Sequence, residues 1–214
     1  DEVEERSGGN PLFAVQLVTE LVQSAKLQLG KSGFVLKHGE KLELPNNIFE
    51  LWASRLKRAL AGHTSASRIA LEIAAALGRE VSNREWRKAC ELAQLDVEPH
   101  LLDTLIAHDL IQLGDDGWSF VHGLLRESVE LWSKQNGRWE AVNAACSEML
   151  LNLYTRHEFP FSERMANFLA EADEGEASLG YRLEAADIRV EMCDFARAEE
   201  HIRKTYQTAH QIGL

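Results

Sequence analysis

Apolar residues recur every three or four positions over most of this chain, and this spacing predicts a mainly α-helical fold. The segments that show it are residues 12–29, 47–60, 65–77, 82–90, 97–108, 124–132, 138–154 and three further stretches from residue 162 onward. The interval changes to about two at residues 34–44 and 110–121, which predicts two short β-hairpins. The pattern therefore indicates helices with two small hairpins inserted among them.

Two of the predicted helices begin with a capping box, in which paired side chains satisfy the free N–H groups of the first turn. Asn47 with Glu50 marks one of these helices, and Ser82 with Glu85 marks the other. Gly78 is expected to end the helix that lies between them.

The two hairpins differ in how clearly the sequence marks their turns. The first is predicted to pair residues 34–36 with residues 42–44. The second is predicted to pair residues 110–113 with residues 118–121 through the turn Gly114-Asp115-Asp116-Gly117.

The order of these elements predicts three domains. Residues 1–62 form a helical lid with a small hairpin. Residues 63–135 contain three helices followed by a two-stranded hairpin, which is the order of a winged helix. Residues 136–214 form a helical linker and the start of α-hairpin repeats, because tightly joined helices there carry small residues where they would touch. These small residues are Ala185, Ala186 and Ala198.

Composition narrows the choice of partners. The formal net charge is −11, which opposes broad contact with nucleic acid or with an anionic membrane.

No run of 18 apolar residues is present, so no membrane span is predicted. The three cysteines are far apart and read as reduced thiols of a cytoplasmic protein. The first residues, 1–6, are typical of a segment cut from a longer chain.

The predicted winged helix is itself acidic, with 12 acidic and 7 basic residues between Thr64 and Gln135. Its third helix begins with residues 97–103, which include neither Arg nor Lys, and the tip of its wing is Asp115-Asp116. Phosphate groups would be repelled, so DNA binding by this segment is not expected.

Several short motifs in this order carry a family resemblance. They are Gly9-Asn10-Pro11-Leu12-Phe13 at the start of a helix, Leu44-Pro45 after a hairpin, and residues 120–127, Phe-Val-His-Gly-Leu-Leu-Arg-Glu, after the wing. Together with the winged helix, residues 1–155 resemble the C-terminal half of the nucleotide-binding module of STAND-type signalling ATPases. This group includes bacterial regulators with LuxR-type, cyclase or protein-kinase domains, and more distantly the NB-ARC switch proteins.

The resemblance implies a nucleotide-contacting role for a few residues. It places the Gly9-Asn10-Pro11 segment over the base, with Pro11 against adenine, and His122 at the β-phosphate of ADP in the closed state. The residue after His122 is Gly123, where the NB-ARC form has Asp. The alternative is that Pro11 only starts a helix, which Asn10 caps, and that His122 only packs between the wing and the next helix.

The catalytic parts of such an ATPase are not in this sequence. No GxxxxGK[ST] motif occurs. The nearest approximation, Gly30-Lys31-Ser32, has Ala25 in place of the first glycine and is predicted to follow a helix. The histidines lack metal-ligand spacing, so no metal site is predicted. We therefore expect no nucleotide hydrolysis and no cofactor in this chain, with ADP or ATP bound by the parent protein.

The last helices provide a second resemblance. Residues 194–202, Asp-Phe-Ala-Arg-Ala-Glu-Glu-His-Ile, are similar to the second helix of a tetratricopeptide repeat, which implies a protein or peptide ligand. Thr205 departs from the small apolar residue usual one turn later, and plain helical packing is the alternative. Residues 162–214 include 11 acidic and 6 basic residues, which favours a basic or apolar ligand.

These observations predict a regulatory fragment of a STAND-like ATPase, which couples nucleotide state to ligand sensing through domain rearrangement. Its partners would be the upstream nucleotide-binding domain of the same parent and a protein or peptide on the helical repeats. The main alternative is a stand-alone scaffold for protein–protein interaction that never binds nucleotide. A third is an enzyme whose catalytic domain is missing from this sequence.

Overall fold

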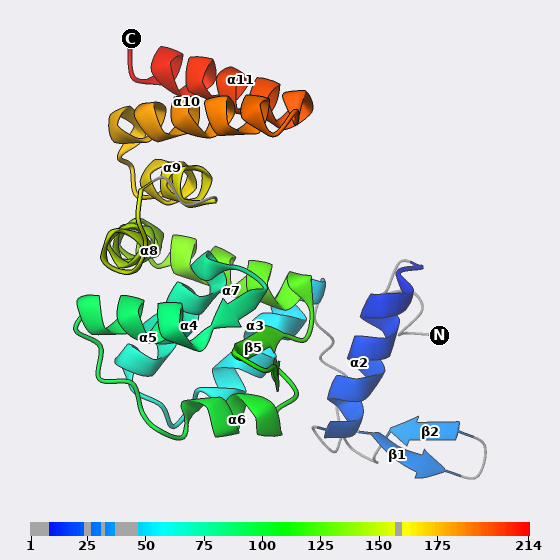
Figure 1. Cartoon of the computed structure of the whole chain (residues 1–214). Coiled ribbons are helices and arrows are strands. Elements are labelled where there is room, and N and C mark those ends of the chain that lie inside the picture. Colours follow the sequence, from blue (N-terminus) through cyan, green and yellow to red (C-terminus); the bar gives the residue numbers. More distant parts are fainter. Residues whose placement is uncertain (1–8, 24–26, 31–32, 37–46, 157–159) are drawn as a thin grey trace. The chain divides into compact units, whose positions relative to one another are not determined.

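The computed structural model describes residues 9–23, 27–30, 33–36, 47–156 and 160–214, and it is mainly helical, as the sequence predicts (Figure 1). Within these residues lie ten helices and two small antiparallel sheets. The chain divides into two compact units, residues 1–61 and 62–214. The division falls one residue before the predicted boundary at residue 62, and it does not separate residues 63–135 from 136–214.

The first unit contains α2 (Pro11–Gln23), β1 (Leu27–Gly30), β2 (Gly33–Leu36) and α3 (Ile48–Ala59). The prediction of a helix up to residue 29 is wrong, because the chain leaves α2 at Gln23 and β1 pairs with β2 in a hairpin. Gly30 lies opposite Gly33 at the end of this hairpin. The predicted partner strand of β2, residues 42–44, lies outside the described residues.

Helices α2 and α3 are joined by polar side chains as well as by apolar packing. Arg58 donates from both terminal nitrogens to the carboxylate of Glu20, at 2.6 and 2.8 Å, and Arg55 donates to Gln16 at 3.0 Å. The buried apolar residues of the two helices are Phe13, Leu17, Leu21, Ile48, Leu51, Trp52, Leu56 and Ala59.

The capping box predicted at the start of α3 is confirmed. The backbone N–H of Glu50 donates to Asn47 Oδ1 at 2.9 Å, and Asn47 Nδ2 donates in turn to Glu50 Oε1 at 3.3 Å. Two side chains three residues apart therefore fix the first turn of this helix.

The second unit opens with helices and a three-stranded sheet in alternation. Its elements are α4 (Ser65–Leu77), β3 (Glu80–Ser82), α5 (Asn83–Leu92), α6 (Leu101–Ala107), β4 (Ile111–Leu113) and β5 (Gly117–Phe120). The strands are antiparallel in the order β3-β5-β4. The predicted hairpin of β4 and β5 is present, whereas β3 was not predicted. Gly117 is required there, because a Cβ atom would lie 2.0 Å from the carbonyl oxygen of Val81.

Two details of this part differ from the prediction. Helix α6 begins at Leu101, not near residue 97, so the residues before it form a connection. At the start of α5, Ser82 makes no side-chain cap bond within the described residues. Glu85, its predicted capping partner, points elsewhere, because its carboxylate binds Arg164.

Five helices follow in sequence: α7 (Gly123–Gln135), α8 (Trp139–Leu153), α9 (Phe161–Glu171), α10 (Gly175–Glu191) and α11 (Phe195–Gln211). Helix α8 packs on α4 and α5, α9 on α8, α10 on α9, and α11 on α10 (Figure 1). Helix α10 begins at Gly175 and spans 17 residues. Three-residue turns join the last three helices, and each contains a residue with positive φ, Asp173 or Cys193.

Buried carboxylates connect the earlier helices of this unit to the later ones. Glu72 of α4 is fully buried and accepts hydrogen bonds from Ser133 and Arg138. Glu85 of α5 accepts two from Arg164, both at 2.7 Å, and one from Tyr154 at 2.6 Å. These ion pairs join α4 and α5 to the region around α8 and α9.

Candidate functional site

The Gly9-Asn10-Pro11 segment forms the exposed start of α2. Gly9 has a φ of +80°, a conformation that favours glycine. Asn10 caps the helix, because its Oδ1 accepts from the backbone N–H of Phe13 at 3.2 Å, and Pro11 is the first helical residue. The helix-starting role of these residues is therefore visible, and the exposed ring of Pro11 is accessible to a ligand.

His122 occupies the N-cap position of α7, two residues after β5 ends at Phe120, and its side chain makes no cap hydrogen bond within the described residues. Its side chain is half-buried, and its backbone carbonyl accepts from the N–H of Leu125 at 3.1 Å. Gly123 is the first residue of the helix, so a polar side chain at position 122 lies beside the N-terminal N–H groups of α7. His122 belongs to the second unit and Pro11 to the first.

Gly30-Lys31-Ser32 does not have the surroundings of a phosphate loop. Strand β1 precedes it, so the prediction that this segment follows a helix is wrong. The strand is followed by a second strand, however, and Gly30 pairs directly with Gly33. A phosphate loop instead leads from a strand into the N-terminus of a helix. Residues 31–32 themselves lie outside the described residues.

A groove of about 440 Å³ runs along α5 and the connection that leads into α6. It is lined by Trp86, Arg87, Cys90, Glu91, Leu95, Val97, Glu98, Pro99, Leu101 and Leu102. Burial raises the pKa of the Cys90 thiol to about 12, so this cysteine is a packing residue and not a reactive thiolate. The groove offers apolar contact area and no activated nucleophile from Cys90.

Beside this groove, three side chains place a hydroxyl, an imidazole and a carboxylate in a row. His63 Nε2 lies 3.1 Å from Thr104 Oγ1, and His63 Nδ1 lies 2.5 Å from Glu98 Oε2. Hydrolase triads use the same order of groups. Sequence reasoning missed this cluster, because 35 residues separate His63 from Glu98 and 41 separate it from Thr104, and no local motif marks it.

The surroundings of the cluster favour a structural role. Glu98 also accepts from Ser67 Oγ at 2.9 Å and from the backbone N–H of Thr64 at 3.3 Å, at the start of α4. Hydrogen bonds from His63 and Ser67 hold the pKa of Glu98 below its usual value. Thr104 lies inside α6, where its own N–H donates to the carbonyl of His100. An oxyanion site needs N–H groups aimed at a reacting atom, whereas these groups link the starts of α4 and α6.

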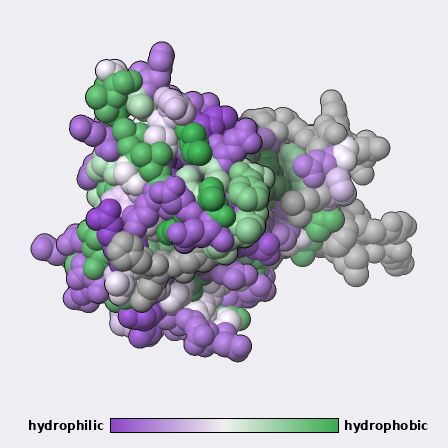
Figure 2. All heavy atoms as spheres, turned by 45° about the horizontal axis from the view of Figure 1, so that its top comes forward, coloured by the Kyte–Doolittle hydropathy of each residue, from purple (hydrophilic) through white to green (hydrophobic). Residues whose placement is uncertain are grey.

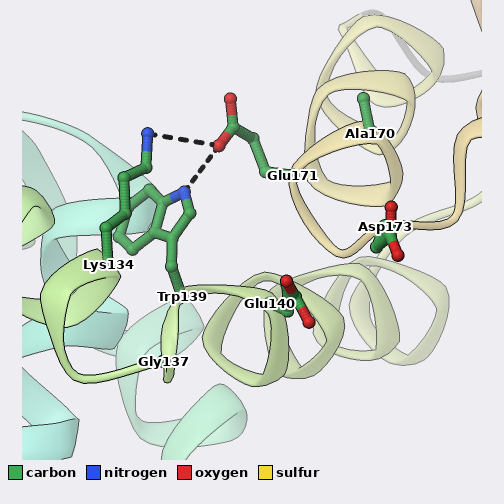
Figure 3. Close-up of a pocket in the computed structure, with 7 residues that line it drawn as sticks. All are labelled: Lys134, Gly137, Trp139, Glu140, Ala170, Glu171 and Asp173. Atoms are coloured by element: carbon green, nitrogen blue, oxygen red, sulfur yellow. Dashed lines mark hydrogen bonds and ion pairs between the residues drawn. The ribbon is translucent and has the colours of Figure 1, made fainter. Parts of the chain in front are cut away.

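A second pocket, of about 390 Å³, lies at the ends of α7, α8 and α9 (Figure 3). Glu171 accepts a hydrogen bond from Trp139 Nε1 at 2.6 Å and lies 3.4 Å from Lys134 Nζ. Lys134 Nζ also lies 5.3 Å from the centre of the Trp139 ring, within cation–π range. The polar groups satisfy one another here, which favours a link between three helices over a ligand site.

The helices α9, α10 and α11 meet across an unusually polar contact. Arg189 of α10 binds Glu163 of α9 at 2.5 and 3.1 Å and Asp194 before α11 at 3.2 Å. His201 of α11 lies 3.7 Å from Glu163, and its burial lowers its pKa despite the opposing effect of that carboxylate. Arg182 is buried, and its Nε and Nη1 atoms find no hydrogen-bond partner among the described residues. The small residues Ala185, Ala186 and Ala198 are buried, as predicted.

Five large apolar side chains remain exposed on α10 and α11: Leu183, Val190, Phe195, Ile202 and Tyr206, with exposed fractions of 42–75%. We call these five residues the apolar face. Figure 2 brings this end of the chain forward, and hydrophobic residues there form separate groups among hydrophilic ones. These five residues are the large apolar side chains that α10 and α11 expose to solvent.

No described helix is long and apolar enough to cross a membrane. Among the described residues there is also no group of three or more side chains that could hold a metal ion. Comparison of the chain with protein-family models, with curated proteins and with solved structures gives no match.

Proposed function

We propose that this chain is the regulatory part of a STAND-like signalling ATPase, in which nucleotide state and partner binding are coupled. The proposal rests on the order of elements around Pro11 and His122, the two residues predicted to contact the nucleotide. A helix begins at Asn10-Pro11, a hairpin and α3 follow, and His122 occupies the N-cap position of the helix after β5. This is the order that the family resemblance implies.

Within this proposal, residues 63–135 are a winged-helix domain. Three helices alternate with three antiparallel strands as α4-β3-α5-α6-β4-β5, and the last strand lies in the middle of the sheet. The role of this domain is to carry His122 on its last strand-to-helix junction, where a bound β-phosphate would meet both the imidazole and the N-terminus of α7. The helices after it would relay the state of this junction to a bound partner.

The proposal does not include DNA recognition by the winged helix. Residues of α6 that are exposed include Asp103 and Ile106, and the turn between β4 and β5 exposes Asp115 and Asp116. A winged helix normally binds DNA through its third helix and its wing. Here α6 and the β4–β5 turn, which correspond to them, have no exposed basic residue.

The test is a substitution of His122 in the protein that carries this chain together with its nucleotide-binding domain. If the imidazole contacts the β-phosphate, His122→Ala should weaken ADP binding by about 1–3 kcal/mol, the range for losing a hydrogen bond to a charged group. The population should shift by about five- to a hundredfold toward the open state and raise basal output. Isothermal titration with ADP measures the first effect, and a signalling assay measures the second.

His100→Ala is the matched control, because His100 is exposed and lies before α6. It should leave ADP affinity and basal output unchanged. A lowered melting temperature of His122→Ala with unchanged ADP affinity would mean that His122 only packs between β5 and α7.

A second function is favoured by the apolar face of α10 and α11. This surface alone would serve a stand-alone scaffold for protein–protein interaction with no nucleotide. In that case ADP should leave the melting temperature of the whole protein unchanged, whereas a bound ligand always stabilises the folded state by mass action.

A further inference from the structure

We propose that the apolar face of α10 and α11 binds a basic amphipathic α-helix of a partner protein. This inference rests on the proposed role of the last helices in partner binding, and it names the chemistry of that partner.

The two rows of apolar residues lie on one side of the helix pair. On α10, Leu183 and Val190 are about 180° around the helix from Tyr181 and Ile188, at 3.6 residues per turn. Tyr181 contacts Phe161 of α9 at a ring distance of 6.1 Å. Leu183 and Val190 therefore face away from α9.

On α11, Phe195, Ile202 and Tyr206 fall within about 40° of one another around the helix. They lie about 120° from His201, the residue that approaches Glu163 of α9. Because α10 and α11 are antiparallel neighbours, both rows face the side opposite α9.

The shape of this surface suits a helix. Residues at spacings of seven and four along a helix form ridges, and a third helix packs into the groove between two such ridges. The molecule already packs its helices in this way, since α9 packs on α10 from the other side. A partner helix on the apolar face would continue the same helix-on-helix layering.

The rim of the face determines the charge of the partner. Glu176, Asp187, Glu191 and Glu199 are exposed around it, and the basic or titratable rim residues are Arg203 and His210. Lys or Arg flanking the apolar stripe of a partner helix would be attracted to this rim, which improves both specificity and association rate. A second copy of the chain would bring two acidic rims together, so self-association through this face is disfavoured.

The probe is a synthetic helical peptide of about 18 residues with Leu at i, i+3, i+4 and i+7 and Lys on both flanks of this stripe. A matched peptide carries Glu in place of each Lys. Binding to the full chain is measured by fluorescence anisotropy at about 0.15 M salt. We expect the Lys peptide to bind at least tenfold more tightly than the Glu peptide. Equal binding of the two peptides would overturn the charge assignment.

Two protein variants test the location of binding. Ile202→Glu should weaken the binding of the Lys peptide at least tenfold, whereas Leu151→Glu, at an exposed apolar residue of α8, should leave it unchanged. Circular dichroism and melting temperature establish that both variants are folded, and Tyr206→Ala provides a second, milder change on the face. Unchanged binding by folded Ile202→Glu and Tyr206→Ala would overturn the proposal.

Light scattering provides the remaining decisive measurement. A dimer of the wild-type chain that dissociates on Ile202→Glu would assign the face to a second copy and overturn the proposal. Since the peptide assay contains no nucleotide, its result is independent of whether His122 contacts ADP.

Discussion

At the scale of single residues, buried charges determine how the second unit is held together. Glu85 is nearly buried, and it accepts hydrogen bonds from Arg164 and Tyr154. Burial by itself would raise the pKa of this carboxyl, but the hydrogen bonds from Arg164 and Tyr154 outweigh it and lower the pKa below 4.5. The ionised form of Glu85 therefore stabilises the fold.

Glu85→Gln should lower the free energy of unfolding at neutral pH by about 2–4 kcal/mol, because it leaves the guanidinium of Arg164 without its buried counter-ion. The stabilisation by Glu85 is present above its unfolded-state pKa and is lost as pH falls through the lower folded-state pKa. The difference between the variant and wild type should thus shrink below about pH 4. Urea unfolding at a series of pH values measures it.

Glu130→Gln is the matched control for this prediction. Glu130 pairs with Lys134 and Arg126 on a more accessible surface, and such pairs contribute about 0–1 kcal/mol. A loss at Glu130 as large as that at Glu85 would contradict the assignment of Glu85 as a buried anchor.

At the scale of elements, the helix starts of the second unit differ in what holds them. Thr64 Oγ1 accepts from the backbone N–H of Ser67 at 3.3 Å and so caps α4. The corresponding serine of α5, Ser82, has no such bond within the described residues. Sequence alone makes Ser82 the better cap, since Glu85 follows three residues later, but Glu85 is engaged by Arg164.

Thr64→Ala should therefore destabilise the second unit by about 1 kcal/mol, the usual effect of losing a cap. Ser82→Ala should change the free energy of unfolding by less than about 0.5 kcal/mol, as for a surface position without special contacts. Both are measured as shifts in urea midpoint at constant slope. The reverse order of the two effects would show that Ser82 caps α5 in solution.

At the scale of the whole molecule, charge opposes the binding of nucleic acid. The chain carries a formal net charge of −11, and the exposed residues of α6 and of the β4–β5 turn are acidic or apolar. Binding to duplex DNA depends mainly on Lys and Arg that neutralise phosphates.

We expect no binding of duplex DNA at about 0.15 M salt in an anisotropy titration up to micromolar protein. Gln112→Lys together with Asp115→Lys and Asp116→Lys is the positive comparison, since it places three cations along the β4–β5 hairpin. Micromolar affinity of the wild-type chain with a steep salt dependence would contradict the proposed function of the winged helix.

The sequence by itself determined the features that depend on neighbouring residues. Apolar spacing located α3, α4, α8 and the β4–β5 hairpin, because a helix or tight hairpin buries one face whatever it packs against. The capping box of Asn47 and Glu50 is equally local, since its two side chains are three residues apart. The acidic character of the chain likewise needs no tertiary structure.

Tertiary structure decided which residues meet over long distances. Strand β3 is too short to show a period, and it exists because β5 pairs with it. The apolar residues of Leu27–Gly30 are compatible with a helix or a strand. This segment is a strand because its backbone pairs with β2. Glu85 and Arg164 are 79 residues apart in the sequence, and they form an ion pair. Because Glu85 binds Arg164, it does not form the capping box with Ser82 that the local sequence predicts at the start of α5. The candidate sites divide in the same way. Asn10, Pro11 and His122 are marked by local motifs, whereas the apolar face exists because α10 packs on α9 and α11 packs on α10, which leaves one side of this helix pair uncovered.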